Sequence, residues 1–393
     1  MYYADFHMEM AMTKDFLSRE FNKNFQHAPR YFRAPGRINL IGEHTDYNGG
    51  FVLPAGIDRY CSIAITPSSS QLSTVIASDL DDKVEFEHVP SKSSSGYWMN
   101  YIWGVMHAFK VRGLDIQPFN AIIQSEVPVG AGLSSSAALE VVFAKAFNEL
   151  FHFNLSDIEL TLIAKEAENN YVGLQCGIMD MFASVHARKD MAIKLDCRNL
   201  DFEYVSLQLK TNKILLIDTC IKHELASSEY NQRRQECESV VFKLNQQGIQ
   251  ATSLRDISRV DLDAHRNIFS DKEYQRASYV IEENNRLHQF VAAISKNDWT
   301  AAGALLCASH EGLKNKYQVS CEALDQLVDW CKSSKGVWGG RMMGGGFGGC
   351  TINLVEEEEI SAIIAMVSER YQSRFGVNPK YYIASTGDGA CEF

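Results

Sequence analysis

One segment of the sequence restricts the possible folds of this chain more than any other. It is a glycine- and serine-rich segment at the start of a predicted helix. Residues 128–140 read PVGAGLSSSAALE and follow a predicted strand over Phe119–Glu126. From Leu139 onward apolar residues recur at helical spacing, which predicts a helix beginning at the serine run. Small residues before a helix N-terminus let backbone N–H groups approach an anion, so the segment is typical of a phosphate-binding turn. A serine-capped turn without a ligand is the open alternative.

The order of strand and helix patterns predicts an α+β fold with antiparallel strands early and helices later. Ser156 and Glu159 form a capping-box pattern at the start of a helix that runs to Tyr171. The other predicted elements are strands over residues 60–66, 73–78, 83–87, 191–196, 214–219 and 351–355, a helix over 100–111, a mostly helical stretch over 228–308, a helix from about 357 and an exposed loop over 91–96. The chain length fits two domains, which we expect over residues 1–210 and 211–393.

Charge and cysteine usage exclude several classes of function. The chain carries 38 Lys and Arg against 49 Asp and Glu, a net charge of −11, which argues against a nucleic-acid or membrane-surface binder. No apolar run is long enough for a transmembrane helix, and the first residues lack the pattern of a secretory signal. The 10 cysteines form no C-x-x-C pair, so we expect reduced thiols, no structural zinc and a cytoplasmic location.

Two further segments combine glycine with charged or unusually small residues. Residues 340–350, GRMMGGGFGGC, satisfy G-x-G-x-x-G, but a predicted strand follows where a dinucleotide-binding turn needs a helix. Such a dense glycine loop must adopt positive φ or approach another group closely. Residues 34–54, APGRINLIGEHTDYNGGFVLP, place Arg37, Glu43, His44 and Asp46 in a glycine-rich stretch. The acids can accept hydrogen bonds from sugar hydroxyls and Arg37 can meet a phosphoryl group, although a solvated loop stays open.

Asp180 is the one acid in CGIMDMFAS, residues 176–184. Apolar and small neighbours make it a candidate buried carboxylate. Beside an arginine, such a group can serve as a general base or as a positioning acceptor. A helix N-terminal cap is the alternative interpretation at this position.

These segments, in this order, closely resemble the galactokinase family of the GHMP small-molecule kinase superfamily. GRINLIGEHTDYNGGFVLP resembles the family signature, PVGAGLSSSAALE the ATP loop of the superfamily, and GRMMGGGFGGC its third motif; weaker similarity covers residues 228–237 and 309–325. The resemblance begins at about Phe21 and spans nearly the whole chain. It implies a two-domain fold with the active site in the cleft between domains, and a monomer. The implied activity is the ATP- and Mg²⁺-dependent phosphorylation of the anomeric hydroxyl of α-D-galactose, the entry into the Leloir pathway.

The resemblance also implies a role for particular residues. Arg37 and Asp180 match the catalytic pair of the family, in which phosphoryl transfer relies on positioning and charge neutralisation. The residues matching galactose contacts are Glu43, His44, Asp46, Gly177 and Tyr230. The residues matching the ATP site are Trp98, near the adenine, and Gly130, Ala131, Gly132, Leu133, Ser134, Ser135 and Ser136 around the phosphates. Ser136 and Glu168 match positions near Mg²⁺.

Some positions depart from the family pattern, and two other functions stay open. Met181 stands where Gln is usual, Met343 where Thr is usual, and Trp103 where a basic residue is usual. N-acetylgalactosamine kinase is the enzymatic alternative, because it shares the same framework. A non-catalytic galactose sensor is the alternative from another class. Sensors of this kind have lost the Ser-Ala pair of the ATP loop, whereas Ser136 and Ala137 are present here.

Overall fold

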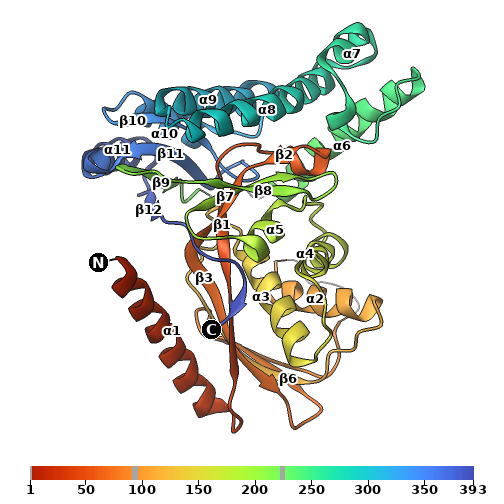
Figure 1. Ribbon diagram of the computed structural model, residues 1–393, viewed down its shortest axis with the longest axis vertical. Helices are drawn as coiled ribbons and strands as arrows, with labels where there is room; N and C mark the ends of the chain where they lie inside the picture. The colour runs from red at the N-terminus through yellow and green to blue at the C-terminus, as the bar shows by residue number, and fades with distance from the viewer. Residues whose placement is uncertain (1, 91–95, 222–225) are drawn as a thin grey trace.

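The computed structural model describes residues 2–90, 96–221 and 226–393 (Figure 1). The lower part of the molecule in Figure 1 is built on a six-stranded sheet with strand order β13-β1-β3-β6-β4-β5, in which only the β4–β6 pair is parallel. Its strands are β1 (Arg30–Asn39), β3 (Pro54–Pro67), β4 (Ser73–Ala77), β5 (Asp82–Phe86), β6 (Phe119–Ser125) and β13 (Cys391–Glu392). The two ends of the chain therefore contribute to the same sheet.

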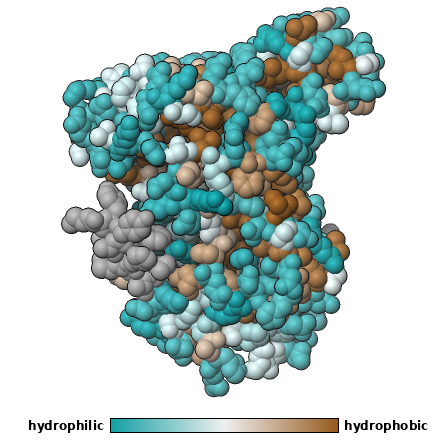
Figure 2. All heavy atoms as spheres, in the orientation of Figure 1, coloured by the Kyte–Doolittle hydropathy of each residue, from teal (hydrophilic) through white to brown (hydrophobic). Residues whose placement is uncertain are grey.

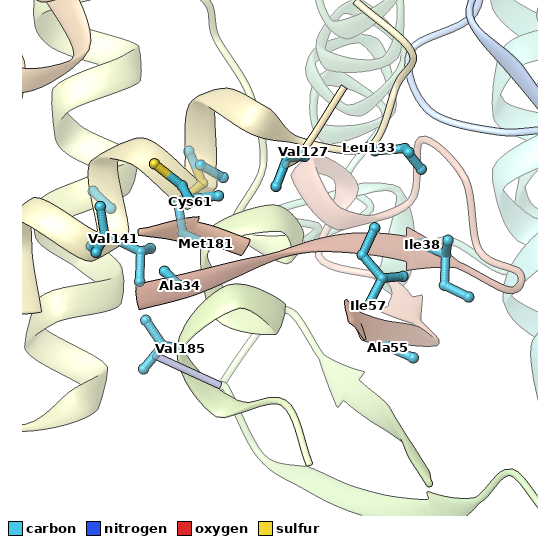
Figure 3. Close-up of a cluster of buried hydrophobic side chains, with 14 of the residues drawn as sticks. Ala34, Ile38, Ala55, Ile57, Cys61, Val127, Leu133, Val141, Met181 and Val185 are labelled. Atoms are coloured by element: carbon cyan, nitrogen blue, oxygen red, sulfur yellow. The ribbon is translucent and has the colours of Figure 1, made fainter. Parts of the chain in front are cut away.

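Helices cover both faces of this sheet. The first helix, α1 (Tyr2–Asn24), lies against β3 and β6 on one face. The opposite face is covered by α2 (Met99–Val111), α3 (Ser135–Leu150), α4 (Asp157–Glu166) and α5 (Met179–His186), and a π-helical turn, η2 (Ala167–Val172), continues α4. Figure 3 shows the core between β1, β3, α3 and α5, where Ala34 and Cys61 lie beside Val141 and Met181. This core fixes where β1 lies relative to the starts of α3 and α5.

The upper part in Figure 1 consists of a helical layer and a four-stranded antiparallel sheet. The sheet has strand order β10-β11-β9-β12, formed by β9 (Asn212–Asp218), β10 (Val337–Met342), β11 (Cys350–Glu356) and β12 (Lys380–Ala384). The helices are α6 (Ala226–Gln246), α7 (Arg259–Ala264), α8 (Asp271–Ser295), α9 (Trp299–Glu311), α10 (Glu322–Lys332) and α11 (Ile360–Phe375), with a π-helical turn, η5 (Gly312–Tyr317), after α9. Short 3-10 turns occur at Asp46–Asn48 (η1), Leu254–Asp256 (η3), Arg266–Ile268 (η4) and Glu357–Glu359 (η6).

A small third sheet lies at the waist of the molecule, in strand order β2-β7-β8. Its strands are β2 (Phe51–Val52), β7 (Met191–Asp196) and β8 (Phe202–Ser206), and α8 packs on β2 and β8. On the face drawn in Figure 2, hydrophobic residues gather at this waist and around α7, and most of the remaining surface is hydrophilic. No helix in the described ranges combines the length and apolar character needed to cross a membrane. All ten cysteines are free.

The predicted strands and helices are confirmed, with end points within a few residues except for β3, which begins at Pro54 and not at residue 60. Ser156 caps α4 and Glu159 completes the capping box. The loop expected over residues 91–96 lies outside the described residues except for Gly96. Several elements were not predicted: α1, α5, α10, β1, β2, β8, β10, β12 and β13.

Candidate active site

The predicted segments meet around one cavity of about 550 Å³ between the lower and upper parts of the molecule. Its walls come from the end of β1 and the loop after it, the glycine-serine segment before α3, the start of α5, one residue of α6 and the glycine loop after β10. The lining residues are Arg37, Glu43, His44, Asp46, Tyr101, Val129, Gly130, Gly132, Leu133, Ser134, Ser135, Ser136, Glu168, Leu174, Cys176, Gly177, Met179, Asp180, Tyr230, Gly344, Gly345, Gly346 and Phe347.

Arg37 and Asp180 form a two-pronged ion pair at the centre of the cavity. The Arg37 Nε and Nη2 atoms donate to the Asp180 carboxylate at 2.8 and 2.7 Å, a fork geometry that fixes both groups. The third nitrogen, Nη1, donates to the Gly132 carbonyl at 2.6 Å. Ser134 Oγ also donates to Asp180, at 2.5 Å. Three segments that are far apart in sequence therefore meet at one carboxylate.

The backbone of β1 places this pair directly against the glycine-serine segment. A register shift between Pro35 and Arg37 bends β1, and the Arg37 N–H donates to the Leu133 carbonyl at 3.0 Å. A Cβ atom at Gly36 would lie 2.7 Å from the same carbonyl oxygen, so only glycine permits this approach. Gly130, Gly132 and Ser134 have positive φ before α3 begins at Ser135. The predicted turn into a helix N-terminus is confirmed and faces the cavity.

Buried acids lie beside the start of α3. Glu168, on η2, faces Ser136, and burial first and the Asp180 charge second raise the pKa of Glu168 to about 7. The Cys176 thiol donates to Glu168 at 3.2 Å. One helical turn below Ser136, the Glu140 side chain is fully buried and neither oxygen has a hydrogen-bond partner among the described residues. Burial, followed by Glu168 and Asp180, raises the pKa of Glu140 well above its usual value, so its neutral form is favoured.

Asp46 and Gly177 meet at another wall of the cavity. A Cβ atom at position 177 would lie 1.8 Å from Asp46 Oδ2, so a glycine is required for the carboxylate to take this place. Burial, then the charge of Asp180, raises the pKa of Asp46 to about 6. Asp46 forms no ion pair within the described part of the chain and lines the cavity, so its carboxylate can accept hydrogen bonds from a ligand.

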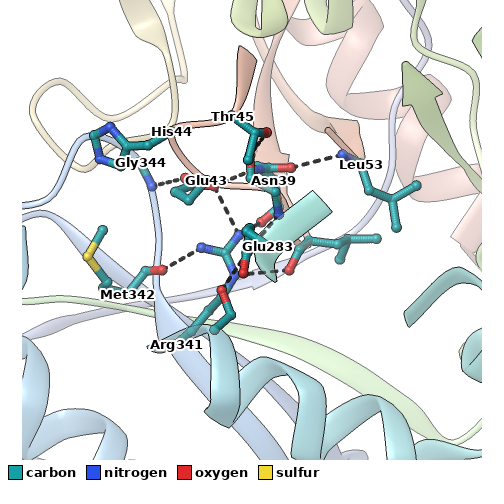
Figure 4. A network of polar contacts seen from close by, with 12 residues as sticks. Asn39, Glu43, His44, Thr45, Leu53, Glu283, Arg341, Met342 and Gly344 are labelled. Carbon is teal, nitrogen blue, oxygen red and sulfur yellow. Dashed lines mark hydrogen bonds and ion pairs between the residues drawn. The ribbon is translucent and has the colours of Figure 1, made fainter. Parts of the chain in front are cut away.

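Glu43 belongs to a buried polar network that joins the two halves of the site (Figure 4). Asn39 and the Gly344 N–H donate to its carboxylate, and Arg341 Nη2 forms an ion pair with it at 3.1 Å. Arg341 is fully buried and also donates to the Leu40 carbonyl at 3.0 Å. The network thus fixes the glycine loop after β10 against the loop after β1.

His44 and Tyr230 complete the predicted sugar-contacting set. His44 has φ of 60°, and its ring centroid lies 5.3 Å from that of Tyr230 on α6. Its Nδ1 faces the Tyr47 hydroxyl at 2.7 Å and its Nε2 faces the Gly345 carbonyl at 3.2 Å. All five residues predicted to contact the sugar line the same cavity.

Two predicted ATP-site residues do not line the cavity. Trp98 lies at the start of α2 and its Nε1 donates to Asp82 at 2.8 Å, and Ala131 is fully buried. The departures Met181 and Met343 are buried in the core, so neither side chain alters the wall of the cavity.

Sequence reasoning missed several residues of the site. Tyr101, Cys176 and Phe347 line the cavity, and Glu140 and Arg341 lie just behind it. Glu140 and Arg341 stood inside the motifs as the only charged residues among small and apolar neighbours, which was a usable signal for buried polar groups. Tyr101 carried no such signal.

Known proteins share these motifs and this fold. The galactose-binding signature of galactokinases matches residues 19–67, and the N- and C-terminal domain descriptions of GHMP kinases match residues 100–188 and 290–373. Galactokinase from Thermosipho africanus is 44% identical over 357 residues, covering 91% of this chain and 98% of its own length, and that from Thermotoga maritima is 43% identical with the same coverage.

Solved structures agree with these matches. Lactococcus lactis galactokinase complexed with galactose is 34% identical, with a TM-score of 0.92 and coverage of 97% of this chain and 100% of that chain. The Methanococcus jannaschii mevalonate kinase, 17% identical with a TM-score of 0.66, shares the fold alone. The two-domain GHMP fold expected from the sequence is confirmed, and the chain belongs to the galactokinase family of GHMP kinases.

Proposed function

We propose that this protein transfers the γ-phosphoryl group of ATP to the anomeric hydroxyl of α-D-galactose, forming galactose 1-phosphate. The observation that carries the proposal is the Arg37–Asp180 pair, which touches Gly132 and Ser134 of the ATP loop and lies in one cavity with Asp46 and Gly177. Family membership supplies the reaction, and the likeness to a galactokinase complexed with galactose supports the sugar.

Asp180 is assigned the role of accepting, or at least orienting, the proton of the anomeric hydroxyl. Its two oxygens already accept from Arg37 and Ser134, so the carboxylate is held in one orientation before the sugar binds. Arg37 is assigned the stabilisation of the transferring phosphoryl group, because its guanidinium lies between this carboxylate and the ATP loop. Both residues act mainly through positioning and charge, as phosphoryl transfer requires.

The ATP phosphates are assigned to the turn from Gly130 to Ser136. Positive φ at Gly130 and Gly132 and the α3 N-terminus just after Ser134 favour an anion at this point. The adenine stays assigned to Trp98, which lies at the start of α2 outside the walls of the cavity, with its Nε1 donating to Asp82 at 2.8 Å.

Mg²⁺ is assigned to Ser136 and Glu168. A hydroxyl and a carboxylate are hard oxygen donors of the kind that Mg²⁺ prefers, and both side chains line the cavity beside the ATP loop. When bound with ATP, the ion neutralises phosphate charge. Glu168 forms no ion pair with a lysine or arginine among the described residues, so its carboxylate is available to a cation, whose charge would offset the cost of burying the ionised form.

Asp46, Gly177, Glu43, His44 and Tyr230 are assigned to the sugar. Asp46 has a carboxylate free of ion pairs among the described residues, so it is available to sugar hydroxyls. Glu43 is instead held by Arg341 and the Gly344 N–H, and it shapes the pocket through this network.

Further assignments are domains over 1–210 and 211–393, a monomer and a cytoplasmic location. The free cysteines support the cytoplasmic location. Strand β13 belongs to the range 211–393 but pairs with β1 of the first sheet, so the second domain sends its last strand back to the first.

The test is ADP release by the purified protein with Mg·ATP, with D-galactose, with N-acetylgalactosamine and without sugar. We expect release that depends on galactose. Release with N-acetylgalactosamine but not galactose would replace the proposed sugar, and binding of galactose without turnover would favour a sensor.

Asp180→Asn separates an enzyme from a sensor. Removal of a positioned base costs about 10²–10⁴-fold in rate, so the variant should bind galactose and lose most of its turnover. Asp263→Asn, which changes an exposed carboxylate on α7, is the matched control and should keep full activity. Full turnover by Asp180→Asn would contradict the assignment of this residue.

A further inference from the structure

We propose that Tyr47 and Tyr317 are positioning residues that hold the imidazole of His44 in one orientation and one tautomer through a hydrogen-bond chain of fixed direction. The chain runs from α6 to the glycine loop after β10, across the wall of the cavity. It deepens the proposed function because His44 lies in the wall assigned to the sugar, and it rests on that function only for its effect on sugar binding.

The chain is continuous and has four links. Cys237 Sγ lies 3.2 Å from the Tyr317 hydroxyl, which lies 2.8 Å from the Tyr47 hydroxyl. The Tyr47 hydroxyl lies 2.7 Å from His44 Nδ1, and His44 Nε2 lies 3.2 Å from the Gly345 carbonyl oxygen. Three of these distances are within the usual range for hydrogen bonds between nitrogen, oxygen and sulfur, and the last is at its upper end.

The Gly345 end of the hydrogen-bond chain determines which atom donates in every link. A carbonyl oxygen only accepts, so the link to Gly345 requires a proton on His44 Nε2. In the neutral ring the other nitrogen, Nδ1, is then a bare acceptor, and Tyr47 must donate to it. The Tyr47 oxygen accepts in turn from Tyr317, whose oxygen accepts from the Cys237 thiol. The opposite direction would place the lone pair of Nε2 against the lone pairs of a carbonyl.

The surroundings of His44 favour this neutral ring. Burial, together with the positive charges of Arg233 and Arg341, lowers the pKa of His44 to about 3, although the Gly345 carbonyl acts in the opposite sense. The ring lies against Tyr317 and Tyr230, with centroids 4.9 and 5.3 Å away. An imidazolium in this place would lack a carboxylate hydrogen-bonded to either nitrogen.

The backbone of His44 needs such support. Its φ of 60° is a left-handed conformation that is uncommon for residues other than glycine. The Asn48 side chain donates to the His44 carbonyl at 2.9 Å and holds the backbone. The hydrogen bonds to Tyr47 and Gly345 hold the ring. Because both ring nitrogens are engaged within the protein, His44 acts on the pocket by holding Gly345 and not by moving a proton.

The chain also connects elements that lie apart in the sequence. Tyr317 ends η5, Cys237 lies in the middle of α6, and Tyr47 lies in the short turn η1 after β1. A change in the packing of α6 on η5 would therefore reach the sugar-binding wall through two hydroxyl groups. Among the described tyrosines, Tyr47 is the one whose hydroxyl is recorded as hydrogen-bonded to His44.

The first test is the ¹⁵N NMR spectrum of the unliganded protein with labelled histidine, with the His44 signals assigned from a His44→Gln variant. We expect a protonated Nε2 and a bare Nδ1 at neutral pH, with no protonation of the ring down to pH about 5. A protonated Nδ1, or an imidazolium at neutral pH, would overturn the proposal. This readout does not depend on the identity of the substrate, so it fails separately from the proposed function.

The second test compares Tyr47→Phe and Tyr317→Phe with Tyr371→Phe. Tyr371 is also fully buried and donates to a backbone carbonyl, at 2.8 Å. It lies on α11 and takes no part in the hydrogen-bond chain of His44. Tyr47→Phe leaves a buried ring nitrogen without its donor, so we expect the KM for galactose to rise about tenfold. The KM for ATP should stay unchanged, and the Nδ1 signal should move toward that of a nitrogen without a hydrogen bond.

The three variants give distinct outcomes. We expect a smaller rise in the KM for galactose for Tyr317→Phe, which removes the donor to Tyr47 and leaves the link to His44 in place. A merely structural role predicts that all three variants lose stability alike and that the Nδ1 signal and the ratio of the two KM values stay unchanged. That result would overturn the proposal. If Tyr47→Phe does not fold, the spectrum of the unmodified protein and the Tyr317→Phe variant still decide it.

Discussion

The Arg37 guanidinium uses all three of its nitrogens, two on Asp180 and one on Gly132, and only a planar fork can make this set of bonds. We therefore expect Arg37→Lys to lower kcat by about 10²–10³-fold even though the charge is kept. The measurement is steady-state ADP release at saturating galactose and ATP.

Arg30 provides a matched control for this substitution. Its Nε and Nη2 atoms donate to Glu392 at 2.7 Å each, in the same fork geometry, but on the surface. Arg30→Lys should leave kcat unchanged. Equal losses in the two variants would mean that Arg37 acts through stability and not through the reaction.

The raised pKa of Asp46 leads to a prediction of how galactose binding depends on pH. Burial raises the pKa of this carboxyl from 3.8 to about 6, so the folded protein holds a proton there that the unfolded chain has lost. The stabilising contribution of that proton is complete below about pH 3.8 and disappears as the pH rises through about 6. An ionised carboxylate accepts hydrogen bonds at both oxygens, so the ionised form is the one we expect to bind sugar hydroxyls. We expect the Kd for galactose to rise as the pH falls below 6, and calorimetric titration at pH 5 to 8 measures it.

Asp46→Asn gives the corresponding control. The amide keeps the size of the side chain and does not titrate, so galactose binding should be weaker and should lose its dependence on pH around 6. A pH dependence that survives in the variant would assign the titration to another group.

The elements of the fold were predictable to different degrees, for reasons that particular residues make clear. Helices α3 and α4 were predicted because spacing and capping act locally. Strand β1 was missed because Pro35 and Gly36 indicate a turn, yet the strand continues through them with a register shift. Strand β10 was missed because Gly339 lies inside it, and glycine is depleted in strands. A Cβ there would lie 2.1 Å from the Gly303 carbonyl oxygen, a contact with α9 that sequence spacing cannot reveal.

The residues of the site also divide into those that the sequence predicted and those that it missed. Most residues that line the cavity stand in motifs of recognisable composition, so the sequence predicted them. The residues behind the wall were missed because their importance depends on which elements pack together. Arg341, for example, is meaningful only once β10 is known to lie beside the loop after β1.

Arg341 therefore gives a prediction for the contact between these two elements. The side chain is fully buried, and its loss would leave the Glu43 carboxylate and the Leu40 carbonyl without this donor. We expect Arg341→Met to lower the free energy of unfolding by about 3–5 kcal/mol and to weaken galactose binding. Chemical denaturation and calorimetric titration measure the two effects.

Arg374 supplies the control for Arg341→Met. It pairs with Glu322 on the surface, and exposed ion pairs contribute little to stability. Arg374→Met should change the free energy of unfolding by less than about 1 kcal/mol. A small effect in both variants would mean that Arg341 is not needed to join β10 to the loop after β1.

Across the whole molecule, the chain returns at its end to the sheet where it began. After β12 in the upper part, residues 391–392 pair with β1, and the Phe393 N–H donates to the Tyr31 carbonyl at 3.1 Å. Lys14 on α1 donates to the Phe393 carbonyl at 2.7 Å, so one short strand ties α1, β1 and the upper sheet together. The cavity itself is lined by none of these residues.

This arrangement predicts that stability and catalysis separate. Deletion of residues 391–393 removes the pairing with β1, the Lys14 contact and the ion pair of Arg30 with Glu392, so we expect the free energy of unfolding to fall by about 2–4 kcal/mol. At low temperature kcat should stay within about twofold of the unmodified value, because Arg37 and Asp180 keep their partners. Glu392→Gln isolates the exposed ion pair and should cost less than about 1 kcal/mol. A deletion that lowers kcat at temperatures where the protein stays folded would show that this strand also fixes the orientation of the lower sheet toward the cavity.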